Sequence, residues 1–539
     1  MHSRMNGSTR RRVDAVLRRA PHPGALVACG LLGLFAGAFW ALLSAAGDRS
    51  TLLSIGPYLL RVLGFSLLQA AISTLLSVIL GTALALALAR RRFPGRGLVL
   101  AALSAAAVMP AIVVVFSVLT VYGRTGWLSD ILSSVGVGAE IPVFGWPGIL
   151  VAHVFLNAPL VARATADAVA TAPAEHWRLA ASLGFSSRQV WRHIDLPILK
   201  SQLPGVATLV FFLCFTSFAI VLSLGGGPAR ATLEVAIYEA LKIDLDFGRA
   251  AWLAFVQVAL CLSLSVLLHW AVEQEHLGHT LREPIPRPDT QDPRLAVLDW
   301  FVLALAGLLI LPLLLSVLSS LASLQAVLDR ELALAFLTSL LIAVSAAVTA
   351  CLLALALAAA ARRHRLERRP RAAALYDALP AIVLTVPPFA LVAGLFLMVR
   401  RFMDPASAGF LLLPLVNGLS ALPFAYSFIN PRLASAGERY GRLTALLGLS
   451  GWTKLALVDW PVIRRPLAAA FAMSMALSFG DFGVVALFGG TELRTLPYLL
   501  YERLGAYRFD EAGALGCLIV LFAFCLAYVS GRFAHAESR

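Results

Sequence analysis

Lysine, and charge of any kind, is scarce in this sequence of 539 residues. Charged residues make up 14% of the chain, whereas hydrophobic residues make up 59%. The three lysines are Lys200, Lys242 and Lys454, and none of them follows glycine as the phosphate-binding pattern GxxxxGK[ST] requires. Nucleophile-elbow and zinc-ligand motifs are missing as well. We therefore predict no catalytic residue, no bound metal and no ATP hydrolysis by this chain itself.

Cysteine is rare too, and its spacing excludes two common roles. The six cysteines all fall inside apolar runs and lack the paired spacing of metal sites or disulfide frameworks. We interpret them as small core residues. They are Cys29, Cys214, Cys261, Cys351, Cys517 and Cys525.

The excess of apolar residues indicates an integral membrane protein. Mean hydropathy is +0.83, and no soluble protein of this length needs so many apolar side chains. The net charge is +14, and a strongly positive net charge is also typical of nucleic-acid-binding proteins. Here, however, the arginines cluster beside apolar runs, which favours membrane topology and contact with anionic lipid headgroups. We expect membrane lipid, and no nucleic acid, as a partner.

Apolar runs of about 18 residues or more, the length that a spanning helix requires, recur along the whole chain. They predict an all-α membrane protein with about twelve spanning helices. Basic clusters follow the second and the eighth run, and such clusters mark the cytoplasmic side. The predicted spans are 24–46, 62–89, 98–122, 147–170, 202–224, 250–272, 297–320, 332–360, 373–399, 408–429, 467–489 and 512–531.

The two ends of the chain are expected on the cytoplasmic side. The first apolar run is too long for the core of a typical cleaved signal peptide, although residues 44–46 offer a weak cleavage-like site. We expect this run to stay as a span that follows a basic cytoplasmic N-terminus at 1–23. An even number of spans then places the C-terminal residues 532–539 in the cytoplasm.

One polar stretch occurs twice. Residues 178–197 (RLAASLGFSSRQVWRHIDLP) and 442–461 (RLTALLGLSGWTKLALVDWP) are identical at eight of twenty positions, and Gly184 and Gly448 lie 264 residues apart. In each copy the glycine is suited to end one helix, a serine to cap the next turn, and the proline to begin a longer helix. A single copy also fits an ordinary cytoplasmic helical hairpin. The duplication favours two equivalent structural units.

Both copies follow the pattern G-x9-[IV]-x-[LW]-P, which resembles the signature loop of permease subunits of binding-protein-dependent ABC importers. In that family the loop forms a short coupling helix that docks on the ATPase subunit. The family usually carries Glu six residues before the glycine, where this chain has Arg in both copies. The ATPase-coupling positions implied by the resemblance are Arg178, Ala181, Gly184, Ile194, Pro197, Arg442, Ala445, Gly448, Val458 and Pro461.

The resemblance also implies a domain organisation, the type I ABC importer permease fold. Six spans separate the two loops, and an even number returns the chain to the same side of the membrane, so the halves are parallel repeats. We expect a first permease domain at 24–272, a cytoplasmic linker at 273–294 and a second permease domain at 295–531. The coupling loops within these domains are 172–197 and 436–461.

Partners follow from the same resemblance. A cytoplasmic ATPase homodimer would hold ATP and magnesium, so that this chain binds no cofactor. A periplasmic binding protein would deliver the solute to the outer loops. The chain itself is then a multi-pass protein of the bacterial inner membrane.

Several segments resemble, within that family, the permeases of thiamine importers. Two of them are SLGGGP at 223–228 and GDFGVVALFGG at 480–490. They imply import of thiamine, or of its phosphate esters, from periplasm to cytoplasm by alternating access. Ferric-iron permeases share the fused architecture and are the nearest alternative. An ion-driven secondary transporter usually shows more intramembrane acidic residues, and a membrane enzyme would need a second catalytic group.

Asp481 is the most informative charge within a predicted span, between Phe479 and Phe482. A carboxylate at that depth is costly unless it has a partner or a function, and it can attract the thiazolium cation of thiamine together with aromatic rings. Pairing with an arginine or a helix N-terminus, or a place near the periplasmic end, is the alternative. For His153 and Asn157 the alternative is packing around Pro159. The candidate translocation path comprises His153, Asn157, Ser217, Phe218, Ser478, Phe479, Asp481 and Phe482.

Overall fold

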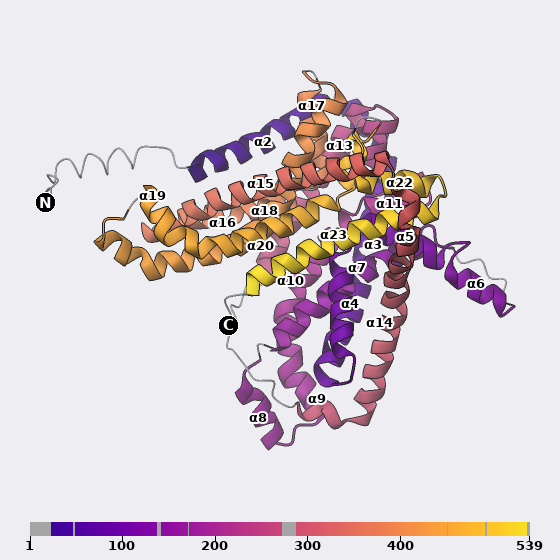
Figure 1. The fold of residues 1–539 in the computed structure, drawn as a ribbon, viewed down its shortest axis with the longest axis vertical. Helices are drawn as coiled ribbons and strands as arrows, with labels where there is room; N and C mark the ends of the chain where they lie inside the picture. Colours follow the sequence, from indigo (N-terminus) through magenta and orange to yellow (C-terminus); the bar gives the residue numbers. More distant parts are fainter. Residues whose placement is uncertain are drawn as a thin grey trace.

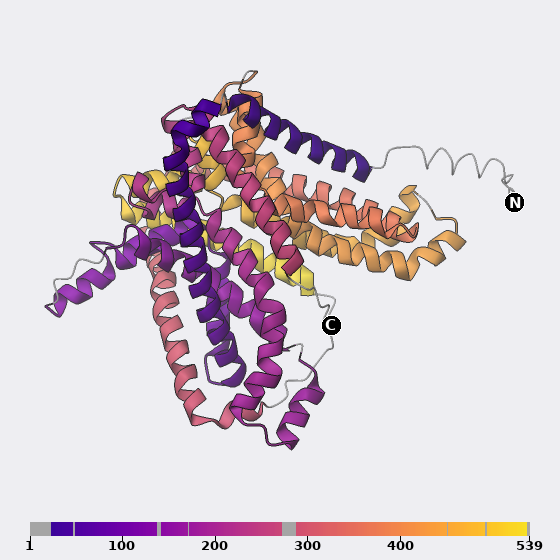
Figure 2. The same ribbon diagram turned by 180° about the vertical axis from the view of Figure 1, so that it is seen from behind.

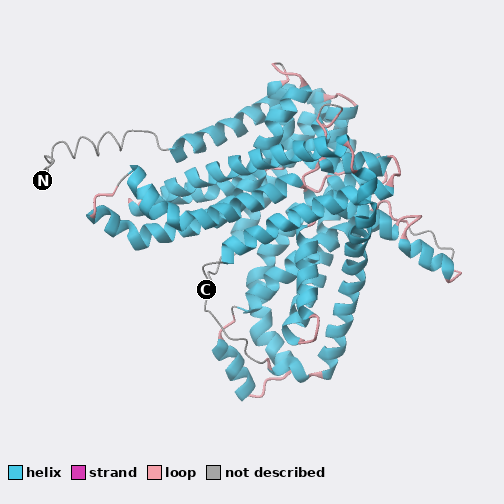
Figure 3. Cartoon of the chain, in the orientation of Figure 1, coloured by secondary structure: helices cyan, strands magenta, loops and turns pink. Residues whose placement is uncertain are grey.

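The computed structural model describes residues 23–46, 49–136, 142–170, 172–271, 287–400, 402–449, 451–490 and 493–535. Within these ranges every regular element is a helix (Figure 3). Eleven helices are long and apolar enough to cross a membrane, and the bent pair α16–α17 makes a twelfth span when it is counted as one. The all-α membrane fold predicted from the sequence is therefore confirmed.

Ten long helices form the frame of the molecule, five in each half. In the first half they are α2 (Pro23–Ala45), α3 (Arg49–Arg90), α7 (Trp146–Ala170), α10 (Leu196–Phe215) and α13 (Phe247–Ala271). In the second half they are α14 (Pro293–Ser319), α15 (Arg330–Leu366), α18 (Pro405–Leu446), α20 (Trp460–Phe479) and α23 (Phe509–His535).

Shorter helices connect this frame. They are α4 (Arg96–Val108), α5 (Ala111–Tyr122), α6 (Trp127–Ser134), α8 (Ala174–Ser182), α9 (Ser187–Val190), α11 (Ala219–Leu224), α12 (Leu233–Tyr238), α16 (Pro370–Thr385), α17 (Pro388–Val399), α19 (Gly451–Lys454), α21 (Gly483–Phe488) and α22 (Leu496–Gly505). Single π-helical turns follow α9, α12 and α19, at Trp191–Asp195, Glu239–Ile243 and Leu455–Asp459.

Two predicted spans are broken by proline. The expected span 98–122 is divided into α4 and α5, and 373–399 into α16 and α17, which bend by 91°. The residue before a proline is forced away from helical geometry, and Met109 and Val386 are indeed extended where they precede Pro110 and Pro387. Each of these two predicted segments therefore consists of two helices rather than one.

The helices form two lobes that meet at one end and diverge toward the other (Figures 1 and 2). The lobes do not coincide with the two halves of the sequence. α14, the first long helix of the second half, packs on α3 and α5, whereas α2 packs on α15 and α17. Each half therefore contributes its first long helix to the other half.

A pair of matching hydrogen bonds relates the two halves. The Ser66 hydroxyl on α3 accepts a bond from the Leu233 N–H at 3.0 Å, and the Ser339 hydroxyl on α15 accepts one from the Leu496 N–H at 2.8 Å. Both leucines begin a short helix, α12 in the first half and α22 in the second. Equivalent contacts in the same chain direction are those expected of parallel repeats.

Candidate translocation site and coupling segments

The first duplicated stretch folds as two short helices around a left-handed glycine. α8 ends at Ser182, and Gly184 has φ +64°, a conformation that L-residues adopt only at a cost. The Ser186 N–H and hydroxyl each donate to the Gln189 side chain at 2.8 Å, which caps α9. A π-helical turn ending at Asp195 then leads into α10.

The second stretch repeats the glycine turn and the π-helical turn, with one difference at its start, and its Ser450 lies outside the described residues. Gly448 also has φ +64°, and α19 is followed by a π-helical turn that ends at Asp459. α18, however, runs without interruption to Leu446 over 42 residues, so it includes the segment that corresponds to the separate helix α8. Both copies lie at the diverging ends of the lobes, near the labels α8 and α19 in Figure 1.

Each copy exposes a pair of leucines one helical turn apart. Trp177 and Ala180 of α8 are buried against α3 and α10, whereas Leu179 and Leu183 are 57% and 62% exposed. Their counterparts Leu443 and Leu447 are 52% and 64% exposed. Large exposed apolar side chains in an i, i+4 pair are typical of a partner-binding surface. None of these four leucines was predicted from the sequence, although the repeated spacing could have revealed them.

The predicted coupling residues fall into two groups. Arg178, Ala181, Gly184 and Pro197 are exposed, as are Gly448 and Pro461, whereas Ile194 is buried and Val458 is half-buried. Arg442 and Ala445 lie on α18, but their side chains are outside the described part of the chain. The buried side chains pack the segment against the lobe, and the exposed side chains are accessible to a partner protein.

The aspartate shared by the two copies anchors each segment through arginine. Asp459 accepts two bonds from Arg362 of α15, at 2.6 and 2.9 Å. Asp195 instead pairs at 2.7 Å with Arg287, which lies at the end of the predicted linker and also binds Asp289. Removing one partner from such a buried pair typically costs about 3–5 kcal/mol. Of the linker 273–294, residues 273–286 lie outside the described residues. The rest contacts the first duplicated stretch, which we name the first coupling segment, through Arg287 and Asp292.

Arg287 is held as a cation by its acidic neighbours. Burial alone would lower the pKa of its guanidinium, but the hydrogen bonds that it donates to Asp289 and the negative charge of Asp195 outweigh burial and raise that pKa. The guanidinium also lies over the Trp177 ring, 4.5 Å from its centroid, a favourable cation–π geometry. The guanidinium of Arg287 therefore stays charged throughout the physiological pH range.

Two further predicted spans, 202–224 and 467–489, break at matching positions. α10 ends at Phe215 and α11 begins at Ala219, while α20 ends at Phe479 and α21 begins at Gly483, so each gap is three residues long. These segments are not the continuous helices that we expected. Asp481 lies in the second gap, and its carboxylate accepts the N–H groups of Gly483 and Val484 at 3.2 and 3.3 Å.

The carboxylate thus lies at the N-terminus of α21, one of the alternatives considered above. At the other end of this helix, Lys242 of the first half donates to the carbonyls of Leu487 and Gly489, at 2.9 and 2.8 Å. A negative group at the N-terminus and a positive group at the C-terminus match the helix dipole. Asp481 is half-buried, so its carboxylate remains accessible to a ligand although it also contacts the helix.

Five aromatic rings from both halves gather beside Asp481; we name them the aromatic cluster. Phe218 lies 4.3 Å from Phe389 and 5.9 Å from Phe482, centroid to centroid. Tyr238 lies 5.2 Å from Phe218, and Tyr501 lies 4.8 Å from Phe482. Phe218 and Tyr238 belong to the first half and the other three rings to the second, so the cluster joins the halves where the lobes meet.

The position of Gly483 shows how close the carboxylate is to these rings. A Cβ atom placed on Gly483 would be 3.5 Å from Asp481 Oδ1, 3.7 Å from Phe389 and 4.0 Å from Phe218. A carboxylate and two aromatic rings thus lie around one point, and these are the kinds of group that attract an organic cation.

The remaining predicted path residues lie elsewhere or play packing roles. Phe479 is buried and packs on Phe336 and Phe522, at 5.7 and 4.2 Å. His153 is 1% exposed, with its Nδ1 2.9 Å from the Ser73 hydroxyl. Asn157 donates to the His153 carbonyl at 2.9 Å, as expected of packing near Pro159.

Ser217 lies in the first helix break, and Ser478 lies in the last turn of α20, just before the second. Ser478 is buried and accepts a bond from Asn417 at 3.0 Å. Ser217 is half-buried and occupies, 264 residues earlier, the position equivalent to Asp481. Of the predicted path, the structure therefore brings together Asp481, Phe482 and Phe218.

Proteins of known sequence resemble this chain over nearly its whole length. Residues 77–274 match the family described as "Binding-protein-dependent transport system inner membrane component". The chain is 39% identical over 523 residues to the thiamine transport system permease protein ThiP of Brucella melitensis, covering 96% of each chain. It is 38% identical to the ThiP protein of Escherichia coli, covering 87% of this chain and 88% of that one, and 33% identical to that of Haemophilus influenzae.

The chain belongs to the thiamine transport system permease family. The stretch of this permease that matches the general family description contains the first coupling segment and ends near the predicted linker. The second half of the permease repeats the glycine, the π-helical turn and the buried aspartate.

Proposed function

We propose that this permease carries thiamine, or its phosphate esters, across the bacterial inner membrane as the membrane-spanning part of an ATP-driven importer. The observation that carries the proposal is the Asp481 carboxylate beside an aromatic cluster built from both halves. The names of the relatives support the same solute.

Thiamine carries a permanent positive charge on a flat aromatic ring, and this site offers both kinds of attraction. An aromatic face contributes about 0.5–2 kcal/mol to binding a cation. A carboxylate about 4 Å away adds roughly 4 kcal/mol of Coulomb attraction at an effective dielectric constant near 20. Phe218, Phe389 and Phe482 would contact the cation, and Asp481 would neutralise it while the solute crosses between the lobes.

The two coupling segments would transmit the motion that moves the solute. A cytoplasmic ATPase homodimer presents two equivalent docking sites, and this chain presents two segments with exposed leucines and matching glycine turns. Closure of the ATPase dimer on ATP and magnesium would draw the diverging lobes together and open the opposite face. A periplasmic binding protein would then release thiamine toward the aromatic cluster. The termini and both segments face the cytoplasm in this arrangement.

Uptake by the reconstituted complex tests this function. Proteoliposomes containing the permease and its ATPase are supplied with the binding protein, and labelled thiamine, thiamine phosphate and ferric iron are compared with and without ATP. We expect ATP-dependent accumulation of thiamine or its phosphates. Accumulation of iron in place of thiamine would contradict the proposal that thiamine is the solute. Uptake driven by an ion gradient without the ATPase would contradict the proposal that ATP drives transport.

A further inference from the structure

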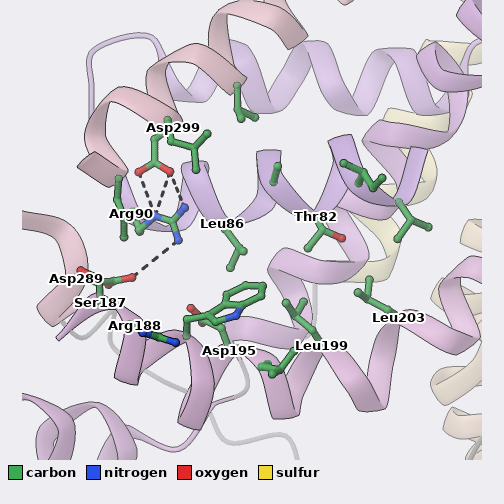
Figure 4. A pocket seen from close by; sticks show the side chains of 18 of the residues that line it. Thr82, Leu86, Arg90, Ser187, Arg188, Asp195, Leu199, Leu203, Asp289 and Asp299 are labelled. Atoms are coloured by element: carbon green, nitrogen blue, oxygen red, sulfur yellow. Dashed lines mark hydrogen bonds and ion pairs between the residues drawn. The ribbon is translucent and has the colours of Figure 1, made fainter. Parts of the chain in front are cut away.

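A large apolar groove lies between α3, α10 and α14, next to the first coupling segment (Figure 4). Its volume is about 1010 Å³. All three helices belong to predicted membrane spans, and α14 comes from the second half of the chain. The walls are formed by aliphatic side chains, chiefly Val78, Ile79, Leu199, Leu203, Leu298 and Val302.

The acidic residues at one end of this groove are largely neutralised. Asp299 is bound by Arg90 at 2.6 Å (Figure 4), and by Arg91 at 2.7 Å. Asp195 and Asp289 both pair with Arg287. These three carboxylates therefore leave little negative charge for a ligand in the groove.

Three cations remain at the same end. Arg188, Lys200 and Arg294 line the groove, are exposed, and make no side-chain ion pair among the described residues. Asp292 is the one other carboxylate lining the groove. Its pKa is held below the usual range because the Ser187 hydroxyl and the Arg294 N–H donate to it, so it stays ionised. The mouth thus carries three cations against one unneutralised carboxylate.

Trp191 marks the level at which the groove changes from apolar to polar. It lines the groove on the π-helical turn after α9 and is 41% exposed. Tryptophan is enriched at the boundary between hydrocarbon and headgroups, where its ring is apolar and its N–H is polar. Arginine and lysine there extend their charged ends toward lipid phosphates.

We propose that this groove binds one anionic phospholipid of the cytoplasmic leaflet. Its phosphate lies among Arg188, Lys200 and Arg294, and one acyl chain follows the aliphatic wall between α3, α10 and α14. A lipid fits better than a protein segment because the wall is made of spanning helices. The leaflet assignment rests on the proposed function, which places the coupling segments in the cytoplasm, whereas the binding itself does not.

Because Trp191 and Asp195 belong to the coupling segment, the bound lipid would brace this segment against α14. The second coupling segment is anchored differently, by Arg362 of α15. The two segments would therefore depend unequally on the surrounding lipid.

Native mass spectrometry of the detergent-purified full-length permease tests the site. Phosphatidylglycerol, phosphatidylcholine with the same chains, and glycerol 3-phosphate are titrated separately. We expect one phosphatidylglycerol to bind at about tenfold lower concentration than phosphatidylcholine, since each basic residue near a membrane surface adds attraction for anionic lipid. Equal binding of the two lipids, or equally tight binding of glycerol 3-phosphate, would overturn the proposal.

Two kinds of variant locate the lipid. Replacing Arg188, Lys200 and Arg294 together with glutamine should weaken phosphatidylglycerol binding about tenfold. The same change at Arg369, Arg371 and Arg439, exposed cations of the second half, should leave it unchanged. If the first triple variant does not fold, Ala207→Phe keeps every charge and fills the groove, and it should remove the bound lipid. Retention of the lipid by Ala207→Phe would refute the site, and the outcome does not depend on thiamine transport.

Discussion

At the residue scale, the contacts of Asp481 separate its structural role from its proposed functional one. The carboxylate accepts two N–H groups at the start of α21, and asparagine serves such a position about as well as aspartate. Asp481→Asn should therefore preserve the fold and remove only the negative charge beside the aromatic cluster.

We predict that Asp481→Asn lowers the rate of thiamine uptake about tenfold or more, because roughly 1.4 kcal/mol of lost attraction already gives that factor. The matched control is Asp329→Asn, since Asp329 caps α15 by accepting the Leu332 N–H at 2.8 Å. Uptake and thermal unfolding of both variants are measured in parallel. Uptake at the wild-type rate by Asp481→Asn would show that this carboxylate has no role in thiamine transport.

Sequence reasoning found the carboxylate and two of the five rings, Phe218 and Phe482, but not the other three, Tyr238, Phe389 and Tyr501. Phe479 lies two residues before Asp481 in the sequence, but its ring packs on Phe336 and Phe522. Phe389 was missed because it is 92 residues away in the sequence, and it reaches the site only through the break before α17. Neighbours in sequence point in different directions on a helix, so tertiary packing decides which rings meet.

At the scale of elements, the two glycine turns make a clear test of coupling. Gly184 and Gly448 have φ +64°, and a Cβ atom at either position would meet nothing within 4 Å. Any effect of a side chain there must come from the backbone, where a left-handed L-residue costs roughly 1–2 kcal/mol.

We predict that Gly184→Val and Gly448→Val abolish the stimulation of ATP hydrolysis by the solute-loaded binding protein, because the valine rotates the helix before the turn relative to the helix after it. Gly205→Val is the control, since Gly205 is helical and a Cβ atom there also meets open space. ATP hydrolysis by the reconstituted complex is the measurement. Unchanged stimulation in both turn variants would count against coupling through these segments.

The coupling segments were predictable because their signals are local. Glycine, serine and proline at fixed offsets specify the turn, the cap and the helix start. The structure has the glycine turn and the proline start in both copies, and the serine cap in the first. The breaks within four predicted spans were not foreseen. Apolar periodicity does not distinguish a continuous helix from two packed pieces, although Pro110 and Pro387 carried the signal for two of them.

At the scale of the whole molecule, the exchange of first helices ties the two halves together. α14 packs on the first half, where Arg90 and Arg91 bind its Asp299. α2 packs on the second half so closely that a Cβ atom on Gly24 would lie 2.4 Å from Ala360. This exchange could not be predicted from the sequence, since the apolar faces of the spans are nearly interchangeable.

We predict that residues 1–272 and 273–539, expressed together as separate chains, assemble in equal amounts, because each half completes the other. An affinity tag on one half and quantification of the captured partner provide the measurement. Deleting residues 23–46 from the first chain, which removes α2, should reduce capture several-fold. Halves that purify independently would contradict the exchanged packing.

In the proposed mechanism, the two coupling segments at the ends of the diverging lobes move toward each other when the ATPase binds ATP. Double electron–electron resonance between spin labels introduced at Ser182 and Leu446, in a cysteine-free background, tests it most directly. Ser182 ends α8 and Leu446 ends α18, and both are exposed. The account predicts that the distance between the labels shortens when ATP is added to the complex with its ATPase. A distance that is the same with and without ATP would contradict it.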